Sequence, residues 1–418
     1  MTDFLITYIV PGIRCGLWLA EGLTGLPILY VCIISTAALL ASRRHQRVTG
    51  GKPGHVQNHD LPTFAVIVPA HNEAILLGRL LESLARLRYP KERYSVYVVA
   101  DNCHDGTAAL ARTYERVRVY ERVDQERRGK GYALRWLLDQ LQADGLNADA
   151  YLFIDADSIV VPEFLTAMAE GLSHGAEALQ GQHTVLNTTT SPSTILRWIT
   201  LTLVNHLRPL GRTAINGSST ITGNGFCLRR SLLERHPWQS YTLAEDREYY
   251  LSLVRNGERI SYVPDAVVRA EMPPTFAQMR TQDIRWEARE TFITRCRTAT
   301  ALLRDGIAHR DFVRLEALAE LLTPPLAVLV AVTGLLLILA LLLGAPLQIW
   351  LALALVGGVL IYIGTGLFLM QLPRAAYPAL LYAPGFMLWK LWVHFVLSRS
   401  KKHTRAWVRT SRRDSMSF

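Results

Sequence analysis

The sequence predicts an α/β domain with a mostly parallel central sheet, joined to α-helical membrane segments. Between residues 64 and 154, short β-rich runs alternate with stretches of helical apolar spacing, which is typical of βαβ units. Long uncharged apolar stretches lie toward both ends of the chain. Half of the 418 residues are hydrophobic and only 19% are charged, a shift from soluble averages that indicates membrane segments.

Three apolar stretches are candidate membrane helices. Residues 324–343 and 347–370 carry no charge, and each has the roughly 20 residues that a helix needs to cross a bilayer core of ~30 Å. Residues 24–42 form the third candidate, for which a cleaved signal peptide is the alternative. A basic cluster begins at Arg43, so the positive-inside rule predicts that the chain enters the cytoplasm there.

The remaining apolar stretch, residues 379–397, is harder to assign because it contains Pro384 and Lys390. A full crossing would put the basic tail on the wrong side, so we interpret the stretch as an interfacial or re-entrant helix. A fourth crossing is the alternative. The predicted localisation is a multi-pass protein of the inner or plasma membrane with a cytoplasmic catalytic domain. Its predicted parts are a membrane segment (1–45), a catalytic domain with interface helices (46–300), transmembrane and interfacial helices (301–398) and a basic cytoplasmic tail (399–418).

Charge and cysteine content narrow the classes of partner. The net charge of +10 is concentrated beside the membrane segments and in the tail, which favours lipid headgroups and phosphate-bearing substrates over nucleic acid. The five cysteines have no metal-ligand spacing, so neither a zinc site nor a disulfide framework is indicated.

Polar residues follow three predicted strands. Residues 64–68 form a β-rich run, 73–87 show helical spacing, and 95–100 form a second strand that ends at Asp101. A further apolar run, 151–154, leads into Asp155. Ligands bind beyond the carboxyl ends of parallel strands, so the polar residues after these strands are expected to converge on one crevice.

Asp155 and Asp157 are the most informative pair in that crevice. Two carboxylates at a strand end repel each other unless a cation joins them, and Mg²⁺ or Mn²⁺ bound there would also hold a diphosphate. A later acidic pair, Glu245 and Asp246, offers a general base. The pair Arg285-Trp286 offers a cationic fork for phosphate and an aromatic face. Together these residues predict a nucleotide-sugar transferase.

Several motifs in fixed order extend this prediction to a family. They are Val68-Pro69-Ala70-His71-Asn72-Glu73, Val99-Ala100-Asp101-Asn102, Arg128-Gly129-Lys130-Gly131, Asp155-Ala156-Asp157, Thr222-Gly223-Asn224-Gly225, Glu245-Asp246, and Gln282 with Arg285-Trp286. Over roughly residues 60–300 the chain resembles membrane-integrated glycosyltransferases of family two, which include cellulose, hyaluronan, chitin and poly-N-acetylglucosamine synthases. The resemblance implies a GT-A-type fold.

The resemblance also implies roles for individual residues. Asp246 would be the catalytic base, and Asp155 and Asp157 would hold Mg²⁺ or Mn²⁺. The residues implied to bind the nucleotide-sugar are Glu73, Asp101, Lys130, Asp155, Gln282, Arg285 and Trp286. Those implied to contact the acceptor are Asn224, Glu245 and Trp286. Structural alternatives stay open: a first-turn acid for Glu73, turn residues for Lys130 and Asn224, a helix cap for Asp246 and a packing anchor for Trp286.

The reaction implied by the resemblance is an inverting transfer from a UDP-sugar to a growing glycan, forming the β-linkages of an extracellular polysaccharide. Transfer of one sugar to a membrane lipid, as by ceramide glucosyltransferases, is the alternative; a catalytically dead scaffold or nucleotide sensor is a third reading. A polymer channel would require a homo-oligomer or an export partner, because only about three spans are predicted. Asp283 also departs from the polymer synthases, which usually have Arg or Gln there.

The basic segment 404–410 resembles the gating loop of hyaluronan-synthase-like members. Its Trp407, Arg409 and Thr410 form a candidate gating loop that would close over the UDP-sugar and exclude water. A lipid-headgroup anchor is the alternative.

Overall fold

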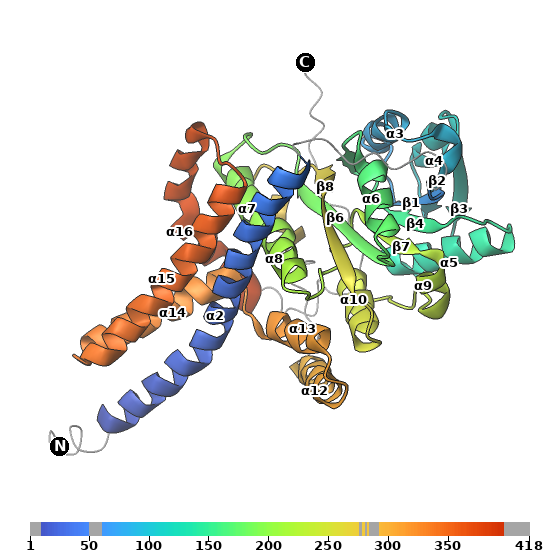
Figure 1. Ribbon diagram of the computed structural model, residues 1–418. Coiled ribbons are helices and arrows are strands. Elements are labelled where there is room, and N and C mark those ends of the chain that lie inside the picture. Colours follow the sequence, from blue (N-terminus) through green and yellow to red (C-terminus); the bar gives the residue numbers. More distant parts are fainter. Residues whose placement is uncertain (1–9, 50–60, 276–277, 281, 284–291, 397–418) are drawn as a thin grey trace.

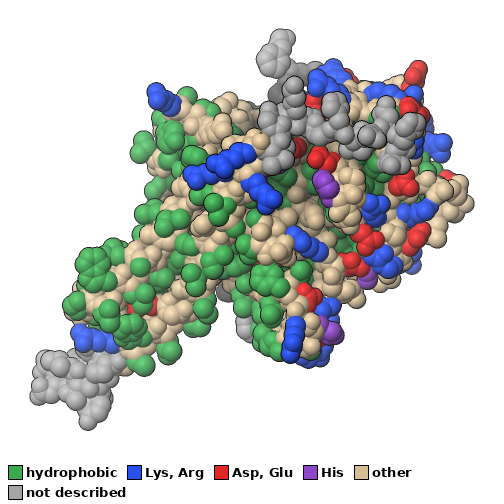
Figure 2. All heavy atoms as spheres, in the orientation of Figure 1, with side chains coloured by type: hydrophobic (Ala, Val, Ile, Leu, Met, Phe, Trp, Pro, Cys, Tyr) green, Lys and Arg blue, Asp and Glu red, His purple; other side chains and the backbone are tan. Residues whose placement is uncertain are grey.

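The computed structural model describes residues 10–49, 61–275, 278–280, 282–283 and 292–396. An α/β body lies beside a limb of long helices (Figure 1). On the face in view, hydrophobic side chains cover most of the limb, whereas acidic and basic side chains gather over the α/β body (Figure 2). The predicted class, an α/β domain combined with membrane-type helices, is confirmed.

One mixed sheet forms the centre of the α/β body. Its strands are β1 (Phe64–Ala70), β2 (Tyr94–Asp101), β3 (Val117–Arg122), β4 (Ala150–Phe153), β5 (Ser158–Val160), β6 (Ala178–Val185), β7 (Phe226–Arg229) and β8 (Ile260–Ala270). The order across the described sheet is β3-β2-β1-β4-β7-β6-β8-β5. The first four strands run parallel, whereas β7 and β5 pair antiparallel with their neighbours. The carboxyl ends of β1, β2 and β4 therefore share one edge of the sheet.

Both faces of the sheet are covered, which explains why β1 is buried throughout. Val66 and Val68 join the core on one face, while Ala65 and Ile67 join the core on the other. Successive side chains of a strand point to opposite faces, so a strand covered on both sides reads as a continuous apolar run. This is the pattern from which the strand was predicted.

Helices of the body cover these faces and connect the strands. They are α3 (Leu77–Ala85), α4 (Thr107–Arg112), α5 (Lys130–Ala143), α6 (Phe164–Ser173), α9 (Arg230–Arg235) and α10 (Glu245–Arg255), with a short 3₁₀ turn η3 (Lys91–Arg93). The helix predicted over 73–87 begins later, at Leu77. A turn precedes it, in which the backbone N–H groups of Leu76 and Leu77 donate to the Glu73 carbonyl. Glu73 thus lies in the loop after β1.

The limb contains the predicted membrane helices. It includes α2 (Val10–Thr49), α14 (Leu326–Leu342) and α15 (Pro346–Leu369). Among the described residues, two helices, 12–47 and Pro346–Leu369, are long and apolar enough to cross a membrane. Helix α13 (Phe312–Leu322) and α14 would make a third span only as a pair, which bends by 66°.

The segment predicted as one interfacial helix, 379–397, is divided in the structure. A 3₁₀ stretch, η5 (Arg374–Tyr382), is followed by α16 (Ala383–Phe395), and Pro384 lies in the first turn of α16, where proline is favoured. The 13 residues of α16 extend over ~20 Å, which is short of the ~30 Å hydrocarbon core. This length agrees with the interfacial interpretation, which stays a prediction.

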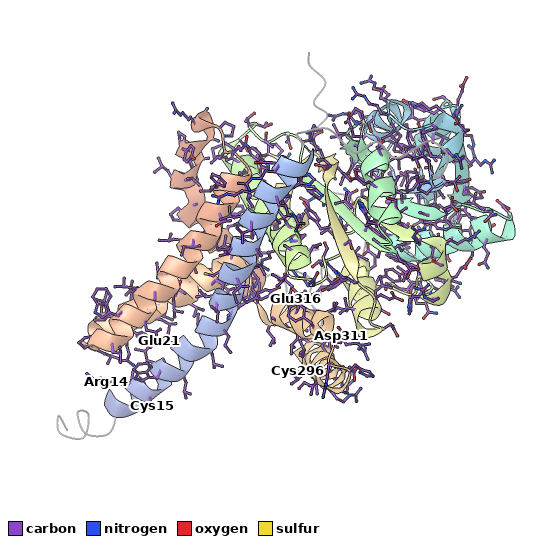
Figure 3. All side chains as sticks on the ribbon, viewed as in Figure 1. Arg14, Cys15, Glu21, Cys296, Asp311 and Glu316 are labelled. Carbon is purple, nitrogen blue, oxygen red and sulfur yellow. The ribbon has the colours of Figure 1, made fainter. Side chains whose placement is uncertain are left out.

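Buried ion pairs join the limb to the α/β body. Between β6 and β7 the chain forms α7 (Pro192–Thr202), a π-helical turn η4 (Leu203–Leu207) and α8 (Arg208–Ala214), and α12 (Phe292–Ala308) precedes α13. Glu316 of α13 accepts hydrogen bonds from Arg212 of α8 (2.5 Å) and from Tyr30 of α2 (2.6 Å). Arg212 also donates to Tyr250 of α10 (2.9 Å). Figure 3 shows Glu316 on α13, next to the limb.

Candidate active site

A cluster of one lysine and three carboxylates lies beyond the carboxyl end of β4. Lys130, the first residue of α5, donates from Nζ to Asp155 Oδ1 (2.5 Å) and to the Gly223 carbonyl (2.6 Å). The same Nζ is 3.8 Å from Glu245 Oε1. Glu245 and Asp246 form the amino-terminal turn of α10. The structure therefore brings together four predicted site residues from three separate motifs.

Two glycines in these motifs allow the cluster to form. A Cβ at Gly131 would lie 2.1 Å from the Ser240 carbonyl oxygen, so only glycine lets the start of α5 approach that backbone. Gly223 has a φ of +74°, and a Cβ there would lie 2.9 Å from Asp246 Oδ2. The glycine motifs thus place Lys130 and Asp246 beside the carboxyl end of the sheet.

The environment of Asp246 suits a general base. Burial raises its pKa, the nearby Asp155 charge acts in the same direction, and Lys130 opposes both. A carboxylate with a raised pKa accepts a proton more readily near neutral pH. Ala244 occupies the cap position of α10, and Asp246 Oδ1 accepts from the Arg247 backbone N–H (2.8 Å) in the first turn. The role of Asp246 as base and its role at the helix end therefore both stay predictions.

Glu245 gives a prediction about pH. Burial raises its pKa from 4.5 to about 7, so the folded chain holds a proton that the unfolded chain releases between these values. The folded state then binds more protons, and this group makes stability fall as pH rises from 4.5 to 7. Without metal and nucleotide, we expect Glu245→Gln to raise the thermal midpoint at pH 8 and leave it nearly unchanged at pH 4. The exposed Glu234→Gln is the control, and equal shifts in both variants at pH 8 would contradict the prediction.

Asn224 organises the turn that carries the paired aspartates. Its Oδ1 accepts from the Asp155 backbone N–H (3.1 Å), and its Nδ2 donates to Ser158 Oγ (2.8 Å). The side chain is almost completely buried, at 1% exposure, and these two hydrogen bonds satisfy both ends of its amide. The geometry therefore makes Asn224 a support for the turn, and its predicted contact with the acceptor stays a prediction.

Asp155 and Asp157 have the oxygen ligands that Mg²⁺ and Mn²⁺ prefer. Among the described residues, no three His, Cys, Asp or Glu side chains are grouped as a metal site. His183 of β6 lies within electrostatic range of both aspartates. Its buried Nε2 has no hydrogen-bond partner among the described residues, and burial lowers its pKa against the pull of Asp155 and Asp157. Burial thus favours a neutral imidazole at His183, the form that can bind a metal ion.

The sequence-based interpretation missed His183 because the strand that carries it was not predicted. The middle of β6 reads Gln180, Gly181, Gln182 and His183. It therefore lacks the apolar residue at every second position that identifies a half-buried strand. Its pairing with β8, in which His183 lies opposite Val268, is visible only in the folded sheet.

Asp101 lies at the end of β2, in the region expected to bind the nucleotide. Its Oδ1 accepts from Arg122 (2.6 Å), while its buried Oδ2 has no hydrogen-bond partner within the described part of the chain. Burial raises the pKa of Asp101, and Arg122 partly offsets this effect. His71, after β1, donates from Nδ1 to the Asp101 carbonyl (2.7 Å), which joins the loops after β1 and β2. Glu73 lies in the first of these loops, where its N–H donates to Thr107 Oγ1 (2.9 Å).

Arg122 is a second residue that the sequence-based interpretation missed. It ends β3 and lies opposite Asp101 in the parallel ladder. The sequence signal for this strand was weak, because the alternation of Val117, Arg118 and Val119 stops at Tyr120 and two charged residues follow.

The remaining predicted residues belong to the last motif and the tail. Gln282 is buried, and its Oε1 has no hydrogen-bond partner among the residues that the structure describes. The other members, Arg285, Trp286, Trp407, Arg409 and Thr410, lie outside the described residues.

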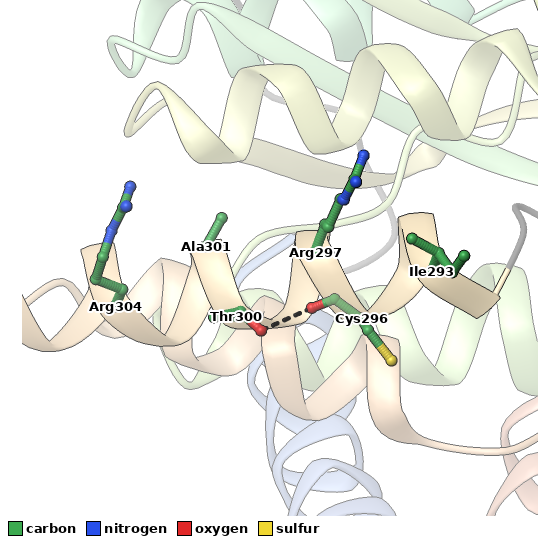
Figure 4. A pocket seen from close by; sticks show the side chains of 6 residues that line it. All are labelled: Ile293, Cys296, Arg297, Thr300, Ala301 and Arg304. Carbon is green, nitrogen blue, oxygen red and sulfur yellow. Dashed lines mark hydrogen bonds between the residues drawn. The ribbon is translucent and has the colours of Figure 1, made fainter.

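A separate hollow lies along α12. It has a volume of about 420 Å³ and is lined by one face of α12, including Cys296, Arg297 and Arg304 (Figure 4). None of the predicted donor-site residues lines it.

The chain is similar to known glycosyltransferases. Residues 62–288 match the family described as "Glycosyltransferase like family 2". A probable glycosyltransferase, YdaM, of Bacillus subtilis is 28% identical over 54% of this chain and 55% of its own length. A beta-monoglucosyldiacylglycerol synthase of Trichormus variabilis is 29% identical over 48% of this chain and 43% of its own length. An N-acetylglucosaminyltransferase of Rhizobium meliloti is 28% identical over 72% of this chain and 73% of its own length.

The chain spans about half the length of the first two of these relatives. Among solved structures, mannosyltransferase PcManGT from Pyrobaculum calidifontis, in complex with GDP-Man and Mn²⁺, has a TM-score of 0.47 and 18% identity, covering 90% of this chain and 96% of that chain. The GT-A-type fold class predicted from the sequence is confirmed.

Proposed function

Because the chain belongs to the glycosyltransferase family 2, we propose that it transfers a sugar from a UDP-sugar to an acceptor at the membrane surface, with inversion. The observation that carries the proposal is the contact of Lys130 with Asp155 and Glu245 beside Asp246. It combines a cation for phosphate with a carboxylate of raised pKa, the two groups that this displacement requires.

The donor would bind along the carboxyl edge of the sheet. The Oδ2 of Asp101, which has no hydrogen-bond partner among the described residues, is suited to accept a hydrogen bond from the uracil ring. Lys130 is suited to neutralise the diphosphate. Asp155 and Asp157, with His183 nearby, would hold Mg²⁺ or Mn²⁺. When bound, such an ion neutralises phosphate charge and orients the leaving group.

In the proposed reaction, Asp246 takes the proton of the acceptor hydroxyl as its oxygen attacks the anomeric carbon. The new carbon–oxygen bond forms as the bond from that carbon to the diphosphate oxygen breaks. UDP leaves with the electron pair, and Lys130 stabilises the charge that develops on it. A single displacement converts an α-linked donor into a β-linked product.

We propose a growing glycan as the acceptor, because the resemblance to polymer synthases extends over the whole catalytic domain. A membrane lipid is the second candidate, and a cavity of about 140 Å³ between α7–η4 and the limb helices favours it. The cavity is lined mainly by apolar side chains, among them Leu203, Leu326 and Phe386. Arg208, Lys390 and His394 also line it. Such a lining suits the acyl chain of a lipid.

One experiment separates these acceptors. The purified enzyme is incubated with a panel of radiolabelled UDP-sugars in lipid vesicles, and the products are resolved by size and by organic extraction. A high-molecular-weight, glycosidase-sensitive product is expected. Label found wholly in one-sugar lipid products would replace the glycan by a lipid acceptor, and absence of UDP release from every donor would reject the proposed function.

A further inference from the structure

Asp283 is the residue at which this chain departs from the polymer synthases, and the structure gives it an unusual environment. The side chain is completely buried, at 0% exposure. It nevertheless accepts hydrogen bonds from three side chains: Arg197 Nη2, Lys390 Nζ (2.9 Å) and Trp389 Nε1 (3.2 Å). Burying a carboxylate with two cations costs desolvation free energy, which well-aligned ion pairs and hydrogen bonds must offset.

These partners come from two elements that are distant in sequence. Arg197 lies on α7, and Trp389 and Lys390 lie on α16. A second contact joins the same regions, because the Arg280 guanidinium lies 5.8 Å from the centre of the Trp392 ring on α16. Helix α16 therefore contacts both Arg280 and Asp283.

The ion pairs keep the carboxylate charged despite burial. Burial alone would raise the pKa of Asp283, but Arg197 and Lys390 outweigh it and the pKa is lowered. The contact is thus a fixed charge cluster over the ordinary range of pH, and its strength depends on the two cations.

The neighbouring residue is one that the sequence resemblance assigns to nucleotide-sugar binding. Gln282 directly precedes Asp283, and its buried Oε1 has no hydrogen-bond partner among the described residues. A buried amide oxygen without a hydrogen bond costs desolvation free energy unless a ligand or a water molecule donates to it. Any shift of Asp283 would move this oxygen, because adjacent residues share one peptide unit.

We propose that Asp283 is a positioning residue that fixes Gln282, one of the residues expected to bind the nucleotide-sugar, against α7 and α16. The inference rests on the proposed function and adds that α7 and α16 hold Gln282 in place for the transfer. It also gives the departure at position 283 a physical purpose: a carboxylate is required there because Arg197 and Lys390 are its partners.

The test compares two fates of the donor. Transfer to the acceptor is measured as label in polymeric plus lipid products, and hydrolysis as free labelled sugar, with UDP affinity measured by calorimetry. Asp283→Asn is expected to lower the ratio of transfer to hydrolysis by about tenfold or more, since misplacing a positioning group penalises the oriented reaction most. UDP affinity should stay within about twofold, and Asp283→Glu, which keeps the charge, should recover part of the ratio.

Two further variants guard against a general loss of folding. Lys390→Met keeps the pair between Asp283 and Arg197 and should lower the ratio in the same direction but less. Glu320→Gln removes the acid from another buried pair, with Arg208 (3.0 Å), and should lower the thermal midpoint without changing the ratio.

The outcomes are distinct. An unchanged ratio in Asp283→Asn, or an equal fall in Glu320→Gln, would overturn the positioning role while the wild-type activity stands. A wild-type enzyme that consumes no UDP-sugar would overturn the proposed function and this inference with it.

Discussion

Replacing Asp246 by Asn is expected to lower the turnover number by a factor on the order of 10² or more, with little change in the affinity for UDP. The variant keeps the size of the side chain and its place beside Gly223, but it removes the oxygen charge that would accept the proton. Proton abstraction acts in the transition state, so its loss affects turnover and contributes little to donor binding.

Initial rates of UDP release and calorimetric titration with UDP measure the two quantities separately. The matched control is Asp139→Asn, which removes an exposed carboxylate paired with Arg135 on the outer part of α5 and should change neither quantity. Parallel losses of turnover and of UDP affinity in Asp246→Asn would instead indicate a structural role.

Replacing Asp157 by Asn is expected to abolish most of the UDP release that Mg²⁺ or Mn²⁺ supports in the wild-type enzyme. The change removes one charged ligand while preserving size, and hard cations of this type lose affinity with each carboxylate removed. Asp157 is a cleaner choice than Asp155, because Asp155 also binds Lys130 and its replacement would disturb two interactions at once.

The measurement is UDP release across a titration of each metal, with chelator as the zero point. The wild-type enzyme should lose activity in chelator, and Asp157→Asn should need a much higher metal concentration for any recovery. Full activity of the variant in excess chelator would contradict the metal assignment, and the Asp139→Asn enzyme should follow the wild-type titration.

Much of the fold was predictable because it depends on local periodicity. The β1 and β2 strands were expected from apolar runs, and their predicted bounds differ from the observed ones by no more than two residues at either end. The long helices of the limb were expected from length and lack of charge alone. Boundaries were less predictable: α3 begins four residues late because a turn on Glu73 precedes it.

The site was predictable from its motifs. Asp155 was expected from its place after a strand, whereas Lys130, Glu245 and Asp246 lie at helix starts and were implied by the resemblance. The four residues lie in one cluster. Their individual roles stay predictions. Arg122 and His183 were not expected, although both contribute to the electrostatics of the predicted carboxylates.

The sequence by itself therefore determined the α/β class, the membrane-type helices, the family and the set of residues at the strand ends. These features follow from periodicity, charge and short motifs, which a local stretch of chain contains in full. Only the tertiary structure decided that Arg122 binds Asp101, that Asn224 supports the Asp155 turn and that Asp283 meets Lys390. These contacts join residues far apart in the chain. They depend on strand register and on how helices pack across the sheet and the limb, and no local stretch of sequence specifies either.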